Sequence, residues 1–413
     1  MENRTVSITL STRILFMITL VTAVFFVIAA SCSPANPPVP ITQTTPSPEI
    51  GQSTEIPTPA ITQPKVTVWI PADFLATHQK EILDLLNEQA NGFVQTRPDL
   101  TVEFRTREDI INWLSLTSRA APEGLPDLVL VDHDTLEIAS LKGLLHPISA
   151  QLDTSQWESH ILQTGMIQAT QFGLPVVADA LVLYEKKGIK STTDLSELFH
   201  SSDRLGLDLS DPRNSLVLSI YLSFGGAVED AAGRPILEEA PLRQTLSLIQ
   251  AGRESGAIST QQNTHAFSAK LWQEFVKRDE GRWIGWYSQL PQEVRSNGKV
   301  TALPAYNDGQ IRSIGSGWYW ALSNTNPLHA EMTNSLLHAF TEPELLDQIA
   351  KISGWLPVNQ NTSVGLTSVP NIQTSPDGLI LVTISPVLQD SVLRVLSGER
   401  PELVASQTAA LFK

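Results

Sequence analysis

The 413-residue chain has few residues of several kinds, and each scarcity excludes a class of protein. It contains one cysteine, Cys32, so it can form no internal disulfide and no zinc or iron–sulfur site built from cysteines. Lysine and arginine number 28 against 43 acidic residues, and a formal charge of −15 argues against a nucleic-acid-binding surface. The eight histidines form no His-x-x-x-His pair, and no phosphate-binding loop or nucleophile-elbow motif occurs. We therefore expect no metal, no cofactor and no enzymatic activity.

Apolar residues, by contrast, are plentiful. They make up 42% of the chain, which suffices for a large core and excludes a wholly disordered protein. The length is typical of two or three domains, or of one large unit with two lobes.

The first 31 residues are predicted to be an export signal. Arg4 and Arg13 supply a positive end, and the apolar run 14–30 is too short for a comfortable membrane-spanning helix. The run ends in IAASC, which resembles the bacterial lipobox, where small residues precede a cysteine that becomes acylated. Cys32 is thus the predicted lipidation site, and the mature protein would be extracytoplasmic and held at the cell membrane. An uncleaved signal anchor with an incidental cysteine is the alternative.

Residues 32–64 are predicted to be a linker. Nine prolines lie between residues 33 and 64, among threonine, serine and glutamine. Such a segment cannot bury a core and should form an extended spacer between membrane and globular domain.

The region from residue 65 to 143 alternates between strand and helix patterns. Continuous apolar or alternating runs predict strands at 65–70, 100–105 and 126–132, and helical spacing predicts helices at 78–94, 109–120 and 135–143. This alternation indicates a parallel sheet covered on both faces, whose ligands sit at the carboxyl ends of the strands. Asp132 and Asp134 end the third strand and are candidate ligand contacts, although Asp134 is also suited to capping the next helix.

The later part of the chain repeats the scheme. A long strand is predicted over 173–184, with further strands at 283–287, 300–303 and 313–323. Helices are predicted at 194–199, 215–224, 241–256, 326–340, 342–351, 386–396 and 402–411.

From about residue 65 to the end, an ordered series of segments resembles one family of proteins. That family is the carbohydrate-binding, maltose-binding-like group of bacterial ABC-transporter solute-binding proteins. Glu185 departs from the pattern, since the family usually has asparagine after the tyrosine of that strand. The segments are KVTVWI, GLPDLVLVD with ASLKGLLHPI, GLPVVADALVLYEKK, SFGGAVEDAAGRPIL, GRWIGWYS, ALPAYNDG, SIGSGWYWALSNTNP and FTEPELLDQIAKISGWLPVN.

The resemblance implies an α/β, two-lobed periplasmic-binding-protein-like fold of type II. Its lobes are joined by crossing segments, here expected near 173–179 and 303–306, with a ligand cleft between them that closes by hinge bending. One lobe would comprise residues 65–176 and 305–350, and the other residues 177–304 and 351–413.

The resemblance also implies a function. The chain would be the solute-binding subunit of an ABC importer, would bind a sugar or oligosaccharide, and would present it to a membrane permease without covalent chemistry. The same fold could instead bind a polyamine, a peptide or a metal chelate. A lipid-anchored glycoside hydrolase would need two carboxylates about 5–10 Å apart, for which Asp132 and Asp179 are candidates. A sensory or adhesive lipoprotein that serves no transporter is a third alternative.

Sugars are held by aromatic faces and by polar side chains that bond their hydroxyls. Four of the nine tryptophans and three of the five tyrosines lie between Trp283 and Trp320. Trp318 and Trp320 point to one face of a strand, so at least one of them is expected to be structural. Core packing remains the alternative for each ring.

By resemblance, Trp286 and Tyr287 occupy the position of a stacking ring. Tyr221 matches a helical aromatic that faces the sugar, and Asp179 lies where the family's sugar binders carry an acidic residue in a crossing segment. The predicted ligand-binding residues are Asp132, Asp134, Asp179, Tyr221, Trp286, Tyr287, Trp318 and Trp355.

Overall fold

The computed structural model describes most of the chain from residue 64 onward. The described residues are 64–76, 78–98, 100–148, 154–207, 209, 211, 213–258, 281–306, 311, 313–324, 327–359 and 372–413. The predicted export signal, the predicted lipidation site Cys32 and nearly all of the predicted linker lie outside them.

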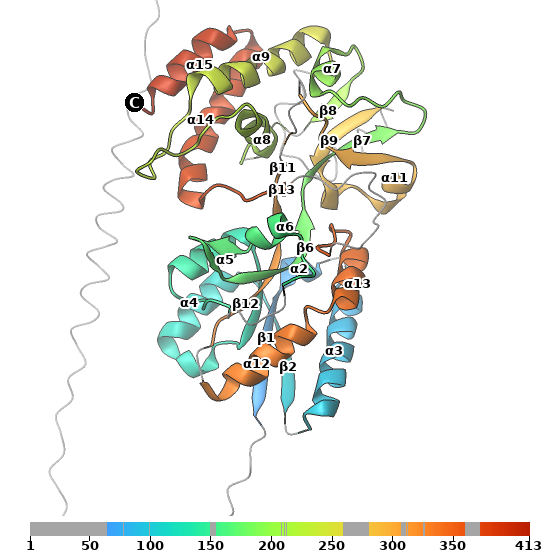
Figure 1. Ribbon diagram of the computed structural model, residues 1–413, viewed down its shortest axis with the longest axis vertical. Coiled ribbons are helices and arrows are strands. Elements are labelled where there is room, and N and C mark those ends of the chain that lie inside the picture. Colours follow the sequence, from blue (N-terminus) through green and yellow to red (C-terminus); the bar gives the residue numbers. More distant parts are fainter. Residues whose placement is uncertain are drawn as a thin grey trace, which may run out of the picture. The chain divides into compact units, whose positions relative to one another are not determined.

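Two sheets organise the described residues, one in each lobe (Figure 1). The first sheet has the strand order β2-β1-β3-β12-β6. Its strands are β1 (Lys65–Pro71), β2 (Thr101–Arg107), β3 (Leu128–Asp132), β6 (Gly173–Asp179) and β12 (Ser316–Leu322). β1 pairs in parallel with β2 and β3, and β12 runs antiparallel to β3 and β6. The carboxyl ends of β1, β2, β3 and β6 therefore meet at one edge of the sheet, as the sequence predicts.

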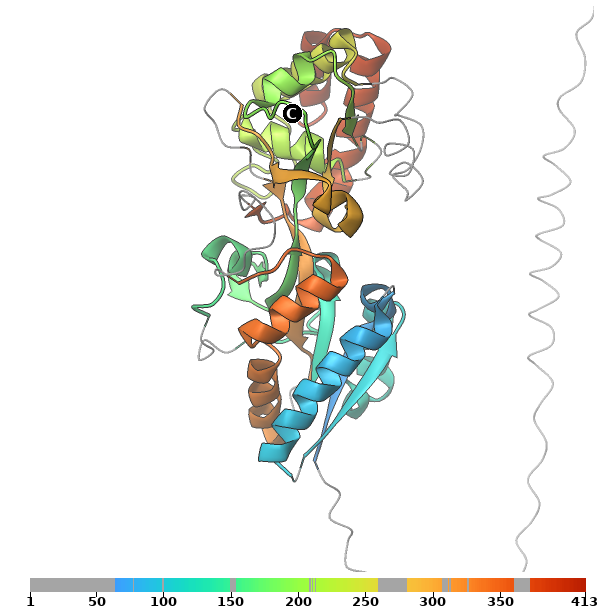
Figure 2. The same ribbon diagram turned by 90° about the vertical axis from the view of Figure 1, so that its right-hand side faces the viewer.

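Helices cover both faces of the first sheet (Figure 2). One face carries α3 (Gln79–Thr96), α12 (Pro327–Ala339) and α13 (Pro343–Ser353), and the other carries α4 (Ile110–Ala120) and α5 (His133–Leu141). Successive strand residues point to opposite faces, so Val68 packs in the first of these cores and its neighbour Trp69 in the second. Apolar side chains on both faces explain why these strands read as continuous apolar runs.

The second sheet has the strand order β10-β7-β9-β8. Its strands are β7 (Leu181–Lys186), β8 (Leu205–Leu207), β9 (Arg282–Trp286) and β10 (Gly298–Ala302). The second lobe also contains α7 (Leu195–His200), α8 (Ser215–Ser223), α9 (Glu239–Ser255), α11 (Gln292–Ser296), α14 (Gly378–Ser397) and α15 (Pro401–Ala410). α9 packs against α7, α8, α14 and α15, and this group of helices forms most of the second core (Figure 1).

Short elements lie outside the two main sheets. They are α2 (Ala72–Leu75), α6 (Ser159–Gln163), the pair β4 (Met166–Ile167) and β5 (Thr170–Gln171), and the parallel pair β11 (Ser313–Ile314) and β13 (Ile372–Gln373). Single 3-10 turns occur at Pro122–Gly124 and Tyr287–Gln289.

The long strand predicted over 173–184 is divided in the structure. β6 belongs to the first sheet and β7 to the second, and the chain changes sheets at Ala180. The sequence places the lobe boundary at 176/177, but β6 continues in the first sheet to Asp179. Both halves of the run are buried, so the apolar pattern carries no mark of the change.

The second difference concerns the residues that follow α13. The sequence places 351–413 together in the second lobe. In the structure, Leu356 exchanges two backbone hydrogen bonds with Ala178 of β6, at 2.8 and 2.9 Å, and packs in the core of the first lobe together with Val358. The chain therefore returns to the second lobe only after residue 359, because these apolar residues find their partners beside β6.

The third difference concerns α14, which begins at Gly378 although the sequence predicts a helix from Pro386. Proline usually marks a first helical turn, because in the interior it removes a hydrogen bond. Here Ile380, Leu381 and Ile384 are buried in the second core, and this burial sustains the helix on the N-terminal side of Pro386. Among the described residues α14 is also long and apolar enough to span a membrane, but 50% of its apolar window is buried, as in the core helix of a globular protein.

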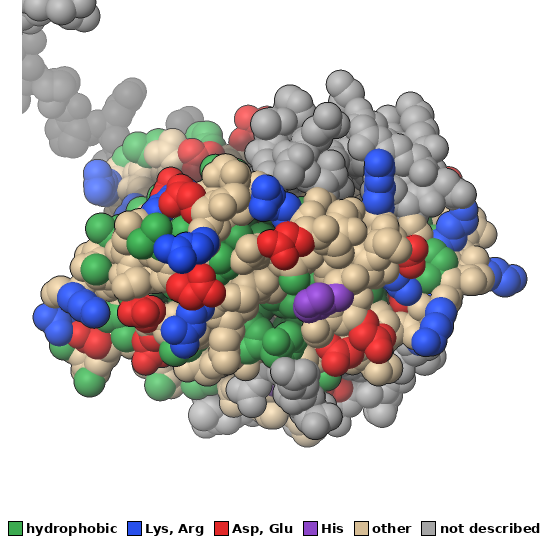
Figure 3. Space-filling model, turned by 90° about the horizontal axis from the view of Figure 1, so that it is seen from above, with side chains coloured by type: hydrophobic (Ala, Val, Ile, Leu, Met, Phe, Trp, Pro, Cys, Tyr) green, Lys and Arg blue, Asp and Glu red, His purple; other side chains and the backbone are tan. Residues whose placement is uncertain are grey.

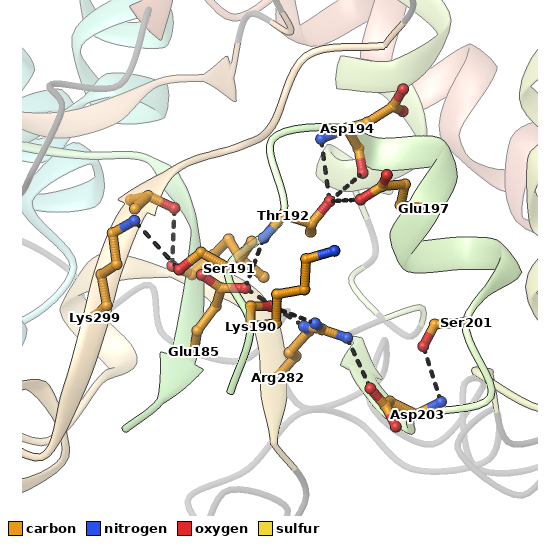
Figure 4. Close-up of polar contacts among 12 residues, drawn as sticks. Glu185, Lys190, Ser191, Thr192, Asp194, Glu197, Ser201, Asp203, Arg282 and Lys299 are labelled. Atoms are coloured by element: carbon orange, nitrogen blue, oxygen red, sulfur yellow. Dashed lines mark hydrogen bonds and ion pairs between the residues drawn. The ribbon is translucent and has the colours of Figure 1, made fainter. Parts of the chain in front are cut away.

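Glu185, the departure from the family pattern, forms a buried ion pair (Figure 4). Its carboxylate is 3.4 Å from the Nε of Arg282 on the neighbouring strand β9, and the two residues are only 2% and 8% exposed. The same guanidinium lies 3.1 Å from Asp203 and donates to the carbonyl of Lys190 at 2.8 Å. The pair thus ties β7 and β9 to the loops around α7, which is a structural role.

The face seen from above in Figure 3 carries acidic and basic side chains side by side. Close ion pairs of the second lobe include Arg234 with Asp230 and Arg394 with Glu399, each at 2.6 Å. Charges of both signs are interspersed on this face, unlike the single-signed basic surface that binds phosphates.

Candidate functional site

A cavity of about 680 Å³ lies between the two lobes. The first lobe contributes Asp134, Glu137, Ile138 and Leu141 of α5, together with Lys142. The second lobe contributes Arg213, Gly378, Leu379, Leu381, Val382, Ser385 and Pro386. The spacing of three and four residues on each helix means that one face of α5 and one face of the first turns of α14 form the walls.

The cavity lies at the sheet edge that the sequence singles out. α5 follows β3 directly, and Asp132 joins the two, at the edge where the parallel strands end. The Oδ1 of Asp132 accepts a hydrogen bond from the backbone N–H of Thr135 at 2.8 Å, so Asp132 caps the helix. The sequence indicates Asp134 as a possible helix cap. In the structure Asp132 is the cap, and Asp134 lies in the first turn, facing the cavity.

Asp134 forms an ion pair with Arg213 of the second lobe. The two residues are 79 positions apart in the sequence, and their contact joins the lobes across the cavity. Their side chains are 45% and 43% exposed, so a molecule in the cavity could reach both. A pair this exposed stabilises a protein by only about 0–1 kcal/mol, so it can exchange its partners for those of a bound molecule.

Glu137 makes a second contact between the lobes. Both of its carboxylate oxygens accept from the backbone N–H of Gly378, at 2.9 and 3.1 Å, where α14 begins. A Cβ on Gly378 would lie 3.2 Å from the carboxylate, so glycine permits this close approach. Burial raises the pKa of Glu137, and the nearby Asp377 carboxylate raises it further, whereas the Gly378 N–H opposes the shift.

Asp179 lies at the junction of the two sheets and is fully buried. It accepts hydrogen bonds from the backbone N–H groups of Ala180 and Ser288, each at 3.0 Å, and from the Ser288 hydroxyl at 2.5 Å. Burial raises its pKa to about 7 although these donors favour the charged form. Asp179 does not line the cavity between the lobes. Its contacts hold β6 to the end of β9, at the point where the chain crosses between lobes.

Trp318 and Trp355 pack together in the first lobe, beside the crossing segments. Their ring centroids are 6.3 Å apart, and Trp318 also lies 5.1 Å from the ring of Phe74. Trp318 is 7% exposed and Trp355 is half-buried against the same core. Neither ring lines the cavity between the lobes.

The other predicted aromatic residues lie in or against the cores. Tyr221 is fully buried, and its hydroxyl donates to the carbonyl of Ala227 at 2.6 Å and accepts from the N–H of Glu238 at 2.8 Å. Tyr287 is buried beneath the guanidinium of Arg295, 4.6 Å from its ring centroid. Trp286, at the end of β9, is half-buried against the second core. The structure thus brings Asp134 to the cavity and places the predicted rings elsewhere.

Several cavity residues are not predicted from the sequence, above all Arg213, Glu137, Leu379 and Val382. Glu137 follows Asp134 by three residues and Arg213 follows Asp211 by two, but these neighbouring charges do not distinguish either residue from a solvated surface residue. Leu379 and Val382 precede Pro386, so they lie in the part of α14 that the sequence does not predict to be helical. The one usable signal was the helical spacing of Asp134, Ile138 and Leu141, which places all three on a single helix face.

The geometry can be compared with known proteins. No protein-family model matches the chain, and no curated protein matches it. Many solved structures do. A cyclo/maltodextrin-binding protein complexed with maltotetraose is 18% identical with a TM-score of 0.66, and the match covers 84% of this chain and 96% of that one. The sugar-binding protein MalE from Xanthomonas citri is 16% identical, with a TM-score of 0.68 and the same coverage of 84% and 96%.

A third solved structure is the extracellular solute-binding protein from Staphylococcus aureus in complex with maltose. It is 13% identical, with a TM-score of 0.66 over 84% of this chain and 96% of that one. At identities this low, the structural likeness shows the fold alone, which is the two-lobed α/β fold of these binding proteins. The fold predicted from the sequence is thereby confirmed.

Within the described part of the chain, no three histidine, cysteine, aspartate or glutamate residues are grouped so that they could hold a metal ion.

Proposed function

We propose that the chain is the solute-binding subunit of an ABC importer and that it binds a sugar or oligosaccharide between its lobes. One observation carries the proposal: a cavity of about 680 Å³ is walled by both lobes, whose ion pair between Asp134 and Arg213 crosses it. A solute there would contact both lobes and would stabilise the arrangement in which both lobes contact it at once. The role needs no covalent chemistry, and the partner would be a membrane permease.

The polar side chains at the cavity suit a hydroxyl-rich solute. The carboxylate of Asp134 accepts from hydroxyl groups, and the guanidinium of Arg213 donates to hydroxyl oxygens in a fixed planar arrangement. A hydrogen bond left unmade in a partly dry site costs about 1–3 kcal/mol, which would provide selectivity among solutes. We therefore propose Asp134 as a direct contact, with Arg213 beside it.

The remaining site residues stay predictions, and the contacts described above suggest supporting roles for several of them. Asp132 would position α5, and Asp179 would hold the crossing between the sheets. The predicted ring contacts are Tyr221, Trp286, Tyr287, Trp318 and Trp355.

Calorimetric titration with a panel of mono- and oligosaccharides tests the solute class. We expect saturable heat with at least one sugar, and an affinity at least tenfold weaker for Arg213→Ala, because a charged hydrogen bond contributes about 1.5–3 kcal/mol. The matched control is Arg243→Ala, which removes an arginine from α9, outside the cavity lining. Heat with a polyamine and none with any sugar would reject the sugar assignment while leaving a solute-binding role.

The proposal includes export and lipid anchoring through Cys32. Cells fed radiolabelled palmitate should label the wild-type protein but not Cys32→Ala, whereas the neighbouring substitution Ser33→Ala should retain the label. Equal labelling of all three proteins, or no label in the wild type, would contradict the anchor without affecting the solute site.

A further inference from the structure

Aliphatic side chains dominate the described lining of the cavity between the lobes. Ile138 and Leu141 contribute from α5, and Leu379, Val382 and Pro386 from α14. No aromatic residue belongs to this described lining, so its described walls offer a solute aliphatic surface and no ring on which a sugar could stack. Such a surface instead gains most from covering an aliphatic group, at about fourfold in affinity for each buried methylene.

These aliphatic side chains are unusually accessible for their type. Leu379 is 74% exposed and Val382 is 76% exposed, while Ile138 and Leu141 are 44% and 49% exposed. Large apolar side chains gathered on one surface mark a binding site more often than a solvated face. Here they belong to two different lobes and face a common cavity.

The exposure of Leu379 and Val382 does not come from a loosely held helix. On the same turns of α14, Ile380 and Ile384 are buried in the second core, at 5% and 0% exposure. The helix start is fixed as well, because the Asp377 side chain accepts from the N–H of Leu379 at 2.8 Å. The aliphatic wall is therefore preorganised, which lowers the entropic cost of binding.

Along α5, the exposed carboxylate and the exposed aliphatic side chains of the lining occupy different turns, and Glu137 between them is only 8% exposed, with its carboxylate on the Gly378 N–H. Asp134 lies in the first turn, where it meets Arg213, and Leu141 ends the helix. A rise of about 1.5 Å per residue separates these two positions by about 10 Å along the axis. Lys142, which follows, can lay its methylene stem along the same wall with its charge in water. A molecule lying along α5 would thus meet Asp134 and Arg213 at one end and, beyond the buried Glu137, the aliphatic side chains of Ile138 and Leu141.

We infer that the solute is amphipathic: a sugar head that carries an alkyl or acyl chain. The head contacts the pair of Asp134 and Arg213, and the chain covers Leu141, Leu379 and Val382. The inference rests on the proposed function for the sugar head, and on the aliphatic wall for the chain.

Titration of the full chain with matched ligands tests this inference. The protein carries Cys32→Ser, so that no lipid anchor competes for alkyl chains. The ligands are maltose, hexyl β-D-maltoside, octyl β-D-maltoside and the octyl ether of tri(ethylene glycol), each below its micelle concentration. We expect octyl maltoside, with two more methylenes, to bind about fifteenfold more tightly than hexyl maltoside, and both to bind more tightly than maltose. The ether, which lacks the sugar, should bind at least tenfold more weakly than octyl maltoside.

Two variants locate the chain site. The double substitution Leu379→Ser/Val382→Ser should abolish the gain from chain length, so that octyl and hexyl maltoside bind this variant equally. Both residues are largely exposed, so the variant should fold normally. The control is Leu393→Ser on the same helix, whose side chain is 40% exposed and lies outside the cavity lining; it should keep the full gain.

Each contrary outcome has a distinct meaning. Maltose binding without any gain from the chain overturns the inference and leaves the proposed function standing. Equal binding of the octyl ether and octyl maltoside overturns the sugar head in both proposals. A chain-length gain that persists in the double variant, or no binding of either alkyl maltoside, overturns the inference; the sugar panel then judges the proposed function by itself.

Discussion

Two apolar regions of the molecule differ in exposure. Side chains in the aromatic stretch between Trp283 and Trp320 are mostly buried, whereas those of the aliphatic cavity wall are exposed. Trp283 and Trp320 are 1% and 0% exposed, whereas Leu379 and Val382 are 74% and 76% exposed. The sequence analysis takes three of its candidate ring contacts, Trp286, Tyr287 and Trp318, from the first region and none from the second. Residue type alone therefore does not distinguish side chains that fill a core from side chains that line the cavity.

The difference follows from the elements that carry the residues. Trp283 and Trp320 lie on strands and point into a packed cluster of buried side chains, so these large rings fill the core. The exposed leucine and valine lie on the outer face of a helix whose inner face already supplies the core. Side chains that the core does not bury remain accessible for contact with a solute.

The largest effect on stability is expected for a buried ring of the aromatic stretch. Trp320 packs 5.4 Å from the ring of Phe340 in the first core. Trp320→Ala should lower the free energy of unfolding by about 3–5 kcal/mol, because it leaves a cavity where a large ring was. Denaturant unfolding measures the loss, and Trp320→Phe should lose less. A loss below about 1 kcal/mol would show that the ring is not part of a packed core.

The next largest effect on stability concerns Asp179, at the junction of the two sheets. Burial raises its pKa from 3.8 to about 7, so the folded protein keeps a proton that the unfolded chain releases in this range. Its contribution to stability should therefore fall as pH rises from about 4 to 7, by at most ~1.4 kcal/mol per pH unit, and level off above 7.

Urea unfolding at a series of pH values checks the Asp179 effect against Asp179→Asn. The variant loses the titrating group, so the wild type should lose more stability than the variant between pH 4 and 7. Parallel curves for the two proteins would contradict the raised pKa.

A smaller effect on stability is expected at the polar end of the cavity. Asp134→Asn removes the charge that faces Arg213, and a half-exposed pair contributes only about 0–1 kcal/mol. Solute affinity should fall more than stability does, which calorimetry and denaturant unfolding on the same samples can separate. A stability loss above about 2 kcal/mol with unchanged affinity would make the pair structural.

The smallest effect on stability is expected for Leu379→Ser/Val382→Ser. Substitutions at exposed positions usually change stability by less than about 0.5 kcal/mol. If thermal unfolding instead shows a large loss, these side chains would belong to the core and the contrast with Trp320 would disappear.

Much of the first lobe could be predicted from the sequence. Strands predicted at 65–70 and 126–132 correspond to β1 (Lys65–Pro71) and β3 (Leu128–Asp132), because strands buried on both faces are continuous apolar runs. The edge where they end could be predicted too, and Asp134 lies in the cavity there. The two-lobed fold followed from the family resemblance of the ordered segments.

The rest depends on tertiary contacts. The division of 173–184 at Ala180 leaves no local trace, because residues on both sides are buried. The ion pair of Asp134 with Arg213 forms only when the lobes meet, and no spacing rule joins residues 79 positions apart. Pro386 suggested a helix start, yet burial of the preceding turns in the second core outweighs the hydrogen bond that proline removes.

Alkylation of a single cysteine in the cavity tests the central claim most directly. In the full chain with Cys32→Ser, a maleimide should modify Val382→Cys rapidly, and saturating octyl β-D-maltoside should slow that reaction at least tenfold. The same glycoside should leave the rate at Leu393→Cys unchanged. An unaltered rate at position 382 would show that the space between the lobes is not where the solute binds.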